Sequence, residues 1–289
     1  MITARAYAKI NLTLDILGKR DDGYHEMDML MQRITLCDEL TLEKLLDGEE
    51  TRLSIESCEY ELSATDNLIL KAHRAVEEAA NRKLPCFYVL SKKIPVAAGL
   101  GGGSANAAAA IDSITALYEL EIPLNQKMEI AASIGSDVPF FLFGNSENDG
   151  KIIRALGRGV ELQDTRTHLN AFVIVIKPCE GLSTAAIFSL YKEHEKIHPD
   201  TAAFLSAVSK GDFAAMKKSG GNSLLPAALS QRPPIADAIA ALYSNGADFA
   251  AMSGSGSCVF GLFADEQTFD AALKAVLKEY PASFGCHTA

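Results

Sequence analysis

PVAAGLGGGSANAAAA, residues 95–110, is the stretch that decides the fold of this chain. It places four glycines, Gly99 and 101–103, between a candidate strand and an alanine-rich segment that favours a helix. The first turn of a helix leaves backbone N–H groups unpaired and carries partial positive charge. Glycine has no Cβ, so a bulky anion can approach those groups, and the Ser104 hydroxyl adds a contact for a phosphate oxygen or a magnesium ion. The stretch therefore predicts a phosphate-binding loop; the competing interpretation is a flexible turn packed against its own helix.

Two common nucleotide-binding signatures do not describe this loop. A Walker A loop ends in Gly-Lys-Ser/Thr, and no lysine follows these glycines. The dinucleotide pattern G-x-G-x-x-G needs a glycine at position 104, where Ser104 stands. The loop is therefore of another type, which the remaining segments of the chain have to identify.

Length and composition are those of a folded protein with two domains or one large one. The 289 residues are 48% hydrophobic and 22% charged, which excludes disorder, collagen and coiled coil as descriptions of the whole chain. The formal net charge of -10 argues against a general nucleic-acid binder, because such a protein needs a basic face to meet phosphate.

No stretch of the sequence has the character of a membrane-spanning helix. The longest uncharged run, 94–111, contains a proline, four glycines and an asparagine. The N-terminal segment carries Lys9 and Asp15 where a signal peptide has its apolar core. The six cysteines form no C-x-x-C pair, so neither a zinc ribbon nor a disulfide framework is indicated. These features predict a cytoplasmic protein with reduced cysteines, and neither a membrane nor a nucleic acid as its partner.

Helices and strands interleave along both halves of the chain, which predicts an α+β protein. Strands are expected over 4–17, 26–36, 38–46, 51–57, 87–94, 171–176, 248–252 and 258–264, with a possible terminal strand. Helices are expected over 66–82, 104–120, 125–134, 183–195, 200–209, 211–219, 234–244 and 266–279. The first of these helices has Thr65 or Asp66 as its candidate N-cap. The turn cluster ENDGK (147–151) predicts a boundary nearby, which we place after residue 155, giving domains 1–155 and 156–289.

Three further segments extend the pattern of the glycine-rich loop. They are AKINLTLDILGKRDDGYHEM (8–27), GSDVPFFLFG (135–144) and MSGSGSCVFG (252–261). In this order and spacing, the loop and these segments resemble the GHMP kinase superfamily, to which galactokinase, homoserine kinase and mevalonate kinase belong. The resemblance implies a two-domain fold, with an N-terminal ribosomal-S5-like β/α domain and a C-terminal ferredoxin-like α/β sandwich. The loop marks only the superfamily, whereas AKINL and GYH point to a branch that acts on a cytidine-diphosphate-linked sugar alcohol.

The resemblance implies an ATP-dependent kinase for the 2-hydroxyl of a cytidine-diphosphate-linked methylerythritol, in the non-mevalonate route to isoprenoid precursors. It implies ATP, with Mg²⁺ bound to the nucleotide, and no metal site in the protein itself. The implied ATP-binding residues are Pro95, Val96, Ala97, Ala98, Gly99, Leu100, Gly101, Gly102, Gly103, Ser104 and Ala105 in the loop, with Asn67 and Lys92 near the adenine. The ordinary alternatives for Asn67 and Lys92 are a helix-start residue and a solvated lysine. Ala105 departs from the family, in which a second serine is common.

Phosphoryl transfer to an alcohol needs neutralised charge, an in-line hydroxyl and a route for its proton. Asp137, which precedes an apolar run, is either a candidate base or a helix cap, and the residues alone favour neither. The resemblance assigns it as the catalytic aspartate. Lys9 is either a solvent-facing edge residue or, on the family's pattern, the partner that keeps Asp137 ionised. Asn11, two residues further on the same strand face, is a candidate for orienting the substrate hydroxyl or phosphate.

Tyr24 and His25 follow the turn at Gly23, and a Tyr-His pair in a loop is ordinarily exposed at the surface without a functional role. In the resembling family these positions hold a cytosine: the tyrosine packs on the ring and the histidine region bonds its edge. Phe188 falls where the family has its second aromatic wall, and Thr184 matches a polar contact in the same segment. Stacking accepts any base, so edge hydrogen bonds must supply the preference for cytosine.

Two further segments receive no role from the sequence. His194-Glu195-Lys196-Ile197-His198 spells the zinc-peptidase pattern H-E-x-x-H, but Pro199 follows it and its neighbours are polar. We interpret it as the end of a solvated helix, since a catalytic zinc needs a third ligand and an apolar wall. GNSLLPA (221–227) resembles the family's asparagine-containing helix start, but it has Leu225 where a glutamate is common.

Alternative functions are another GHMP kinase, acting on homoserine or a mevalonate-like alcohol, and a non-catalytic nucleotide-binding protein. The GYH motif at 23–25 favours a cytidine ligand over the other alcohols. The presence of both Lys9 and Asp137 argues against a non-catalytic protein.

Overall fold

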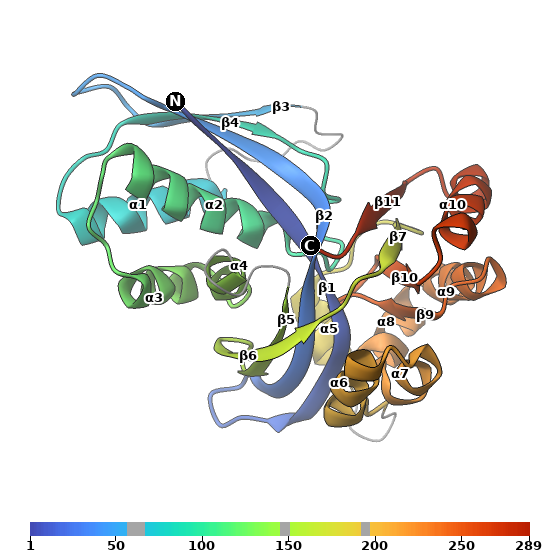
Figure 1. Cartoon of the computed structure of the whole chain (residues 1–289). Helices are drawn as coiled ribbons and strands as arrows, with labels where there is room; N and C mark the ends of the chain where they lie inside the picture. The colour runs from blue at the N-terminus through green and yellow to red at the C-terminus, as the bar shows by residue number, and fades with distance from the viewer. Residues whose placement is uncertain (57–66, 145–150, 192–196) are drawn as a thin grey trace. The chain divides into compact units, whose positions relative to one another are not determined.

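The chain forms two compact units, and each unit draws on several separate stretches of sequence. The computed structural model describes residues 1–56, 67–144, 151–191 and 197–289 (Figure 1). The first unit comprises Met1–Ala8, Cys37–Val96 and Gly101–Asn148, and the second comprises Lys9–Leu36, Ala97–Leu100 and Asp149–Ala289. The order of helices and strands confirms the expected α+β class. A domain boundary after residue 155 stays a prediction, because these units describe compactness rather than one cut in the chain.

Two long strands, β1 (Ile2–Lys19) and β2 (His25–Lys44), contribute to both units. The predicted turn joins them: the Arg20 amide donates to the Tyr24 carbonyl at 2.8 Å, and Gly23 has a φ of 85°, which favours glycine. The sequence predicts two strands over 26–36 and 38–46, and the structure has one. The polar residue Asp38 does not interrupt β2, because it is fully buried and accepts hydrogen bonds from two backbone amides.

In the first unit, β4 (Cys86–Ser91) lies between β2 and β3 (Arg52–Glu56), antiparallel to β2 and parallel to β3. Helices α1 (Leu68–Ala80), α2 (Gly102–Leu117), α3 (Leu124–Ile134) and α4 (Val138–Gly144) pack against one another on one side of β3 and β4 (Figure 1). Asn67 is the N-cap of α1; the predicted caps Thr65 and Asp66 lie outside the described residues.

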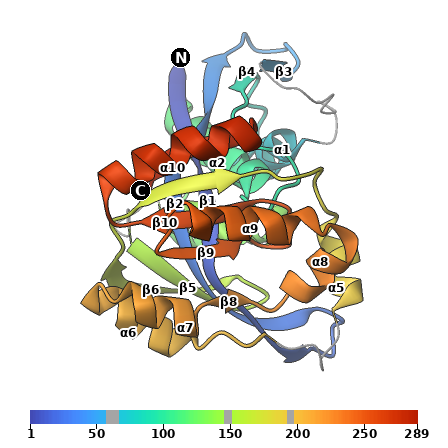
Figure 2. The ribbon, with the colours of Figure 1, turned by 90° about the vertical axis from the view of Figure 1, so that its right-hand side faces the viewer.

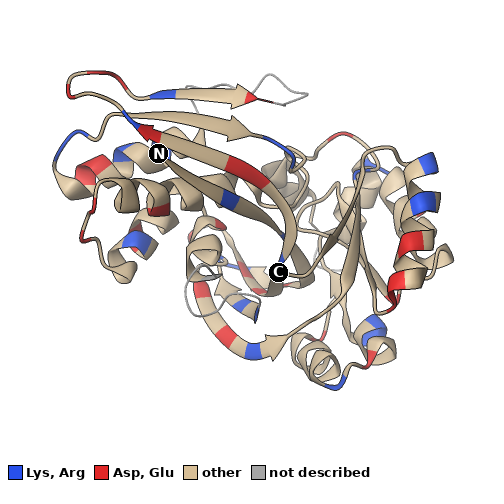
Figure 3. Cartoon of the chain, turned by 45° about the horizontal axis from the view of Figure 1, so that its top comes forward, with Lys and Arg blue, Asp and Glu red and all other residues tan. Residues whose placement is uncertain are grey.

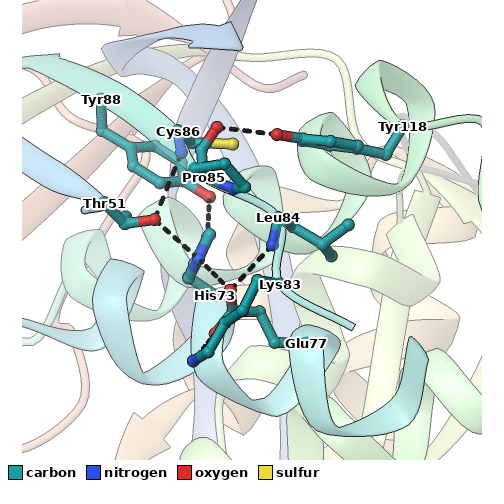
Figure 4. Close-up of polar contacts among 9 residues, drawn as sticks. All are labelled: Thr51, His73, Glu77, Lys83, Leu84, Pro85, Cys86, Tyr88 and Tyr118. Carbon is teal, nitrogen blue, oxygen red and sulfur yellow. Dashed lines mark hydrogen bonds and ion pairs between the residues drawn. The ribbon is translucent and has the colours of Figure 1, made fainter. Parts of the chain in front are cut away.

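A buried polar network ties α1 to β4 and to the segment before β3 (Figure 4). His73 Nδ1 lies 3.0 Å from the Tyr88 hydroxyl, and His73 Nε2 lies 3.0 Å from the Thr51 hydroxyl. One turn further along α1, Glu77 accepts a hydrogen bond from the Leu84 amide at 2.8 Å. Burial lowers the pKa of the His73 imidazole, although the Glu77 carboxylate opposes that shift. The neutral imidazole is therefore the form that this part of the core accommodates.

We predict that His73 makes the folded state less stable in mild acid. Between its lowered pKa and the value of about 6.5 for an exposed histidine, the unfolded chain binds a proton that the folded chain does not. The contribution of His73 to the free energy of unfolding is complete above about 6.5 and is lost as the pH falls from there toward the lowered pKa. Urea unfolding from pH 7.5 to pH 5 measures it: His73→Gln should show a weaker decline than wild type, and His168→Gln, at an exposed histidine, should follow wild type. Equal declines in wild type and His73→Gln would contradict this.

In the second unit, strands pair with β1 and β2 and also form a separate sheet. β5 (Lys151–Gly157) pairs antiparallel with β2 and with β6 (Glu161–His168), and the two-residue strand β8 (Gly221–Asn222) runs parallel to β1. The separate sheet has the antiparallel order β11 (Ser283–His287), β7 (Phe172–Ile176), β10 (Val259–Phe263) and β9 (Phe249–Met252).

Helices α9 (Pro234–Ser244) and α10 (Glu266–Glu279) lie side by side against the separate sheet (Figure 2). The other helices of this unit are α5 (Thr184–Leu190), α6 (Thr201–Lys210), α7 (Phe213–Ser219) and α8 (Leu225–Gln231). Most charges on α10 follow its dipole, with Glu266 and Asp270 toward its start and Lys274 and Lys278 toward its end, and the last residue, Glu279, is the exception (Figure 3).

Most predicted elements are present, and the structure also contains α4, α8, β5, β6 and β8, which the sequence analysis did not predict. β6 is half exposed and consists largely of polar residues, so it lacks the apolar alternation that identifies a strand. The helix predicted over 183–195 is shorter: α5 ends at Leu190, and residues 192–196 lie outside the described part. Within the described ranges, no helix combines the length and apolar character needed to cross a membrane.

Candidate functional site

Helix α2 begins two residues earlier than predicted, so two glycines of the loop form its first turn. Gly101 is the N-cap, with a left-handed φ of 69°, and no side chain caps the helix. The first turn contains no acidic residue. Gly103 is exposed, and a Cβ there would meet only Leu68 Cδ1 at 3.5 Å. The start of this 16-residue helix therefore offers its free amides and its partial positive charge to an anion.

Lys92 is buried at the first turn of α2 rather than solvated. Its Nζ donates to Asp38 Oδ2 at 2.5 Å, and Asp38 Oδ1 accepts from the amides of Lys93 and Ile94 at 2.7 and 2.8 Å. A Cβ on Gly102 would lie 3.2 Å from Lys92 Nζ and 2.9 Å from Ile94 Cγ2. Glycine at 102 thus lets the helix start sit directly on the lysine. Sequence reasoning missed Asp38, since nothing in its strand indicates a partner 54 residues away.

Asn67 shows the ordinary role that its position suggests. Its side-chain oxygen accepts a hydrogen bond from the Ile69 amide at 3.0 Å and caps α1. A contact with adenine stays a prediction for both Asn67 and Lys92.

Residues 97–100 of the loop belong to the second unit and are tied to three other segments of it. The carbonyls of Ala97, Ala98 and Leu100 accept from the amides of Leu182, Cys258 and Lys9, at 3.2, 3.2 and 3.0 Å. The Gly99 carbonyl accepts from the Ser253 hydroxyl at 2.8 Å. Gly99 has a φ of 80°, and a Cβ there would lie 2.0 Å from the Ser253 carbonyl oxygen. Only glycine fits at this position, because both the conformation and the close backbone approach exclude a side chain.

Lys9 and Asn11 form a buried polar pair on β1. They are 3% and 2% exposed, and Lys9 Nζ donates to Asn11 Oδ1 at 2.5 Å. The edge-residue interpretation of Lys9 is therefore wrong. A Cβ on Gly254 would lie 3.4 Å from Lys9 Nζ, and the Asn11 amide donates to the Ser253 hydroxyl at 3.3 Å. The strand that carries the lysine is thus packed directly against the turn 252–256.

Asp137 lies in a turn directly before α4, in the first unit. The Val138 amide donates to the Gly135 carbonyl at 3.1 Å, which closes the turn. The apolar run after Asp137 is buried in α4, as expected, and its buried residues are Val138, Phe140, Phe141 and Leu142. Asp137 itself is half-buried and directly precedes the first residue of this helix. Its pairing with Lys9 stays a prediction.

The predicted nucleobase residues lie in the second unit with aromatic and cationic neighbours. The His25 ring centroid is 5.1 Å from Phe188 and 5.8 Å from Tyr191, while the Arg158 guanidinium lies 4.7 Å from the Tyr24 ring centroid. Tyr24 is 54% exposed, so an aromatic face is open to a ligand. Burial, and then the charge of Lys19, lower the pKa of the His25 imidazole.

Thr184 begins α5, and its hydroxyl lies 3.0 Å from the Ser255 hydroxyl. It is exposed, and this contact joins α5 to the glycine- and serine-rich turn. Tyr191 and Arg158 were missed by sequence reasoning, because an aromatic residue after a helix and an arginine in a turn are common surface residues.

Of the H-E-x-x-H segment, Ile197 and His198 lie within the described residues. His198 Nδ1 lies 2.6 Å from Asp15 Oδ1, while His194, Glu195 and Lys196 lie outside the described residues. Among the residues that the structure describes, no group of three or more His, Cys, Asp or Glu side chains is placed to hold a metal ion.

Burial raises the pKa of the Cys86 thiol to about 11 and that of the Cys258 thiol to about 12, so both stay protonated at neutral pH.

Comparison with known proteins identifies the class to which this site belongs. The family model for the GHMP kinases N terminal domain matches residues 67–145, and the model for GHMP kinases C terminal matches residues 204–282. The chain belongs to the GHMP kinases, a family of small-molecule kinases.

The most informative similarities are to one member of this family. Proteins named 4-diphosphocytidyl-2-C-methyl-D-erythritol kinase from Bacillus cereus and Bacillus anthracis are 38% identical over 262 residues, covering 90% of this chain and 88% of theirs. A crystal structure of 4-(cytidine 5'-diphospho)-2C-methyl-D-erythritol kinase aligns over all of both chains, with a TM-score of 0.82 and 28% identity. Homoserine kinase from Cytophaga hutchinsonii, at 16% identity and a TM-score of 0.74, covers 100% of this chain and 94% of its own and shares the fold.

We predict that both parts of the loop are required for nucleotide binding. Gly99→Ala would force Cβ onto the Ser253 carbonyl, and Gly102→Val would drive a branched side chain into Ile94. Each variant should bind ATP about 5–30-fold more weakly by calorimetry, since strain of this kind costs roughly 1–2 kcal/mol.

Gly18→Ala is the matched control, because a Cβ at Gly18 meets no atom within 4 Å. It should bind ATP as wild type does. Unchanged nucleotide affinity in folded Gly99→Ala and Gly102→Val would show that the glycines serve only the packing of the loop.

Proposed function

We propose that this chain transfers the γ-phosphoryl group of ATP to the 2-hydroxyl of 4-diphosphocytidyl-2-C-methyl-D-erythritol. The hydroxyl oxygen forms a bond to the γ-phosphorus, the bond to the bridging oxygen breaks, and the products are ADP and the 2-phosphate. The observation that carries the proposal is the 38% identity, over 90% of the chain, to proteins of that name. The cytoplasmic location predicted from the sequence stays a prediction.

ATP is assigned to the loop 95–105 and the start of α2. The uncapped helix start and its exposed Gly103 support phosphate binding there, and Lys92 lies at the same turn in a buried ion pair with Asp38. Mg²⁺ arrives with the nucleotide in this proposal. Its typical donors are phosphates with few protein oxygens, and Ser104, half-buried in the first turn, is the hydroxyl that fits this part. When bound, the ion neutralises phosphate charge.

The catalytic roles follow from chemistry and from the family pattern. Asp137 accepts the proton of the attacking hydroxyl or favours its loss, and Lys9 keeps that carboxylate ionised. Asn11 holds the Lys9 ammonium through its side-chain oxygen, which supports a role in orienting the group that reacts. Burial of Lys9 and Asn11 strengthens their electrostatic effect, because water does not screen them.

The cytidine half of the substrate is assigned to Tyr24, His25, Thr184 and Phe188. The exposed Tyr24 ring supplies a stacking surface, and Phe188 packs near His25. Because the pKa of His25 is lowered, its ring is neutral at pH 7 and has both a donor and an acceptor nitrogen. Such a ring suits the mixed donor and acceptor edge of cytosine.

A panel of alcohols tests the substrate. We expect ADP release, followed by a coupled assay, with 4-diphosphocytidyl-2-C-methyl-D-erythritol, and none above the alcohol-free background with homoserine or mevalonate. Activity with homoserine or mevalonate alone would contradict the cytidyl substrate but keep the kinase class. Binding of ATP without turnover of any alcohol would favour a non-catalytic protein.

Replacement of the two catalytic candidates tests the chemistry. Asp137→Asn keeps the size of the side chain but removes its charge, and kcat should fall by about 10²–10⁴-fold, the usual contribution of a general base. Lys9→Ala should lose a similar amount. The double variant should be little worse than the poorer single one, because residues that act as a unit are not additive.

ATP affinity, measured separately, should change little in Asp137→Asn, since the loop carries it. Losses that multiply in the double variant would mean that the two residues act independently. An Asp137→Asn enzyme within a few-fold of wild type would leave Asp137 as a cap of α4.

A further inference from the structure

Asn222 is a fully buried amide whose hydrogen bonds all point to one turn or to its own backbone. It is 1% exposed and lies on β8, opposite Leu14 of β1. Its Nδ2 group donates to the carbonyls of Met252 and Gly254, at 2.9 and 2.8 Å, and its Oδ1 accepts from the Leu224 amide at 2.9 Å. Both amide hydrogens are therefore used to hold the turn at residues 252 and 254.

The two residues whose carbonyls Asn222 binds, Met252 and Gly254, lie on either side of Ser253, next to Lys9 and Asn11. The hydroxyl of Ser253, which lies between these two residues, accepts a hydrogen bond from the Asn11 amide and donates one to the Gly99 carbonyl. Gly254, whose carbonyl Asn222 holds, packs against the Lys9 ammonium: a Cβ there would lie 3.4 Å from Nζ and 3.1 Å from the Gly99 carbonyl oxygen. One side chain thus fixes the turn that meets Lys9, Asn11 and the glycine-rich loop.

The backbone of Asn222 is anchored on the same strand that carries Lys9. β8 pairs with β1 at Thr13 and Leu14, and the next amide, of Ser223, donates to the Leu14 carbonyl at 2.8 Å. Asn222 therefore connects β1 to the turn directly, in addition to the hydrogen bond from the Asn11 amide to the Ser253 hydroxyl.

We propose that Asn222 is a positioning residue for phosphoryl transfer, which acts by holding the turn 252–254 against Lys9, Asn11 and Gly99. The proposal rests on the function proposed above, in which Lys9 and the loop act on the reacting groups. It gives a role to the segment 221–227, which the sequence leaves without one.

Asparagine is the side chain that this position requires. The two carbonyls need two donors from one group, and the Leu224 amide needs an acceptor. An aspartate of the same size has no donor when ionised and one when protonated, and a leucine has neither donor nor acceptor. Asn222→Asp therefore keeps the size of the side chain and removes donors, whereas Asn222→Leu removes every donor and acceptor.

Asn222→Asp and Asn222→Leu, with 4-diphosphocytidyl-2-C-methyl-D-erythritol and ATP, test the proposal. We expect kcat to fall by about 10–100-fold in both at pH 8, with the KM values for ATP and the alcohol within about threefold of wild type, because a misplaced reactive group costs rate more than binding. Relative to wild type, kcat of Asn222→Asp should fall further by roughly tenfold from pH 6 to pH 9, as the buried carboxyl loses its one donor. The ratio for Asn222→Leu should not change with pH.

Asp15, His198 and Lys9 also lie near this strand, and wild type has the same three residues, so we compare each variant with wild type at the same pH. Asn245→Asp is the matched control. Asn245 donates to the Ala241 carbonyl at 2.8 Å at the end of α9, so the change is the same and the site differs. It should keep kcat within about twofold.

Hydrogen exchange gives a readout that does not depend on the substrate. The Asn11 amide and the amide of Cys258, which donates to Ala98, should exchange faster in Asn222→Asp and not in Asn245→Asp. Wild-type kcat and exchange in a folded Asn222→Asp, or an equal loss in Asn245→Asp, would overturn the proposal.

If neither Asn222 variant folds, Ser253→Ala tests the same contacts from the other end. It should lower kcat by about 5–50-fold with little change in melting temperature, and a wild-type kcat would overturn the proposal. A wild-type enzyme that is inactive on every alcohol would instead contradict the proposed function.

Discussion

The hydroxyl of Ser253 joins two segments to which we assign the proposed chemistry, the strand β1 and the glycine-rich loop. It accepts from the Asn11 amide on β1 and donates to the Gly99 carbonyl of the glycine-rich loop. Because a hydroxyl has one hydrogen and two lone pairs, this one group can satisfy a donor on one segment and an acceptor on another. The Gly99 backbone approaches so closely that a side chain there would overlap the Ser253 carbonyl. Glycine at position 99 therefore serves the close packing of the loop against this turn, and access for an anion is the second need that we propose for the loop glycines.

Positive charge in the first unit is held in place by a negative charge that is itself fully buried. Asp38 accepts one ammonium hydrogen bond and two backbone hydrogen bonds, so its desolvation is offset by three strong contacts. Lys92 is thereby fixed at the first turn of α2, beside Gly102. The uncapped helix start favours an anion, whereas the charge of Lys92 is balanced by that of Asp38. In a GHMP kinase, the anion to be bound is a phosphate group of the nucleotide.

Patterns of spacing predicted much of the fold and of the loop. The long strand β1, the helix α1 and the helix that follows the glycines could be predicted, because each has a local apolar period or a glycine signal. β2 was predicted as two strands, since the partner that lets Asp38 stay within a buried strand lies 54 residues away. Burial of Lys9 could not be predicted either, because it depends on packing by Gly254 and Ser253 from the far end of the chain.

The roles of side chains were harder to predict than their elements. The structure shows that Asn67 caps a helix and that Lys92 is in a buried ion pair, while their assignment to the nucleotide stays a prediction. Tyr191 and Arg158 were not assigned at all, although each lies against a predicted substrate residue. Contacts of this kind join residues that are remote in sequence, so no local pattern records them. The motif GYH, by contrast, is local, and together with AKINL it predicts a cytidine ligand.

Phosphorus NMR of the reaction with ATP and 4-diphosphocytidyl-2-C-methyl-D-erythritol tests most directly whether this chain moves a phosphoryl group to an alcohol. We predict that ADP and one new phosphomonoester signal appear in equal amounts, while the diphosphate signals of the cytidyl compound remain. The new phosphorus should couple to the carbon framework at the 2-position. Release of inorganic phosphate without a new phosphomonoester, or the absence of any ATP turnover, would contradict the assignment of this site as a kinase active site.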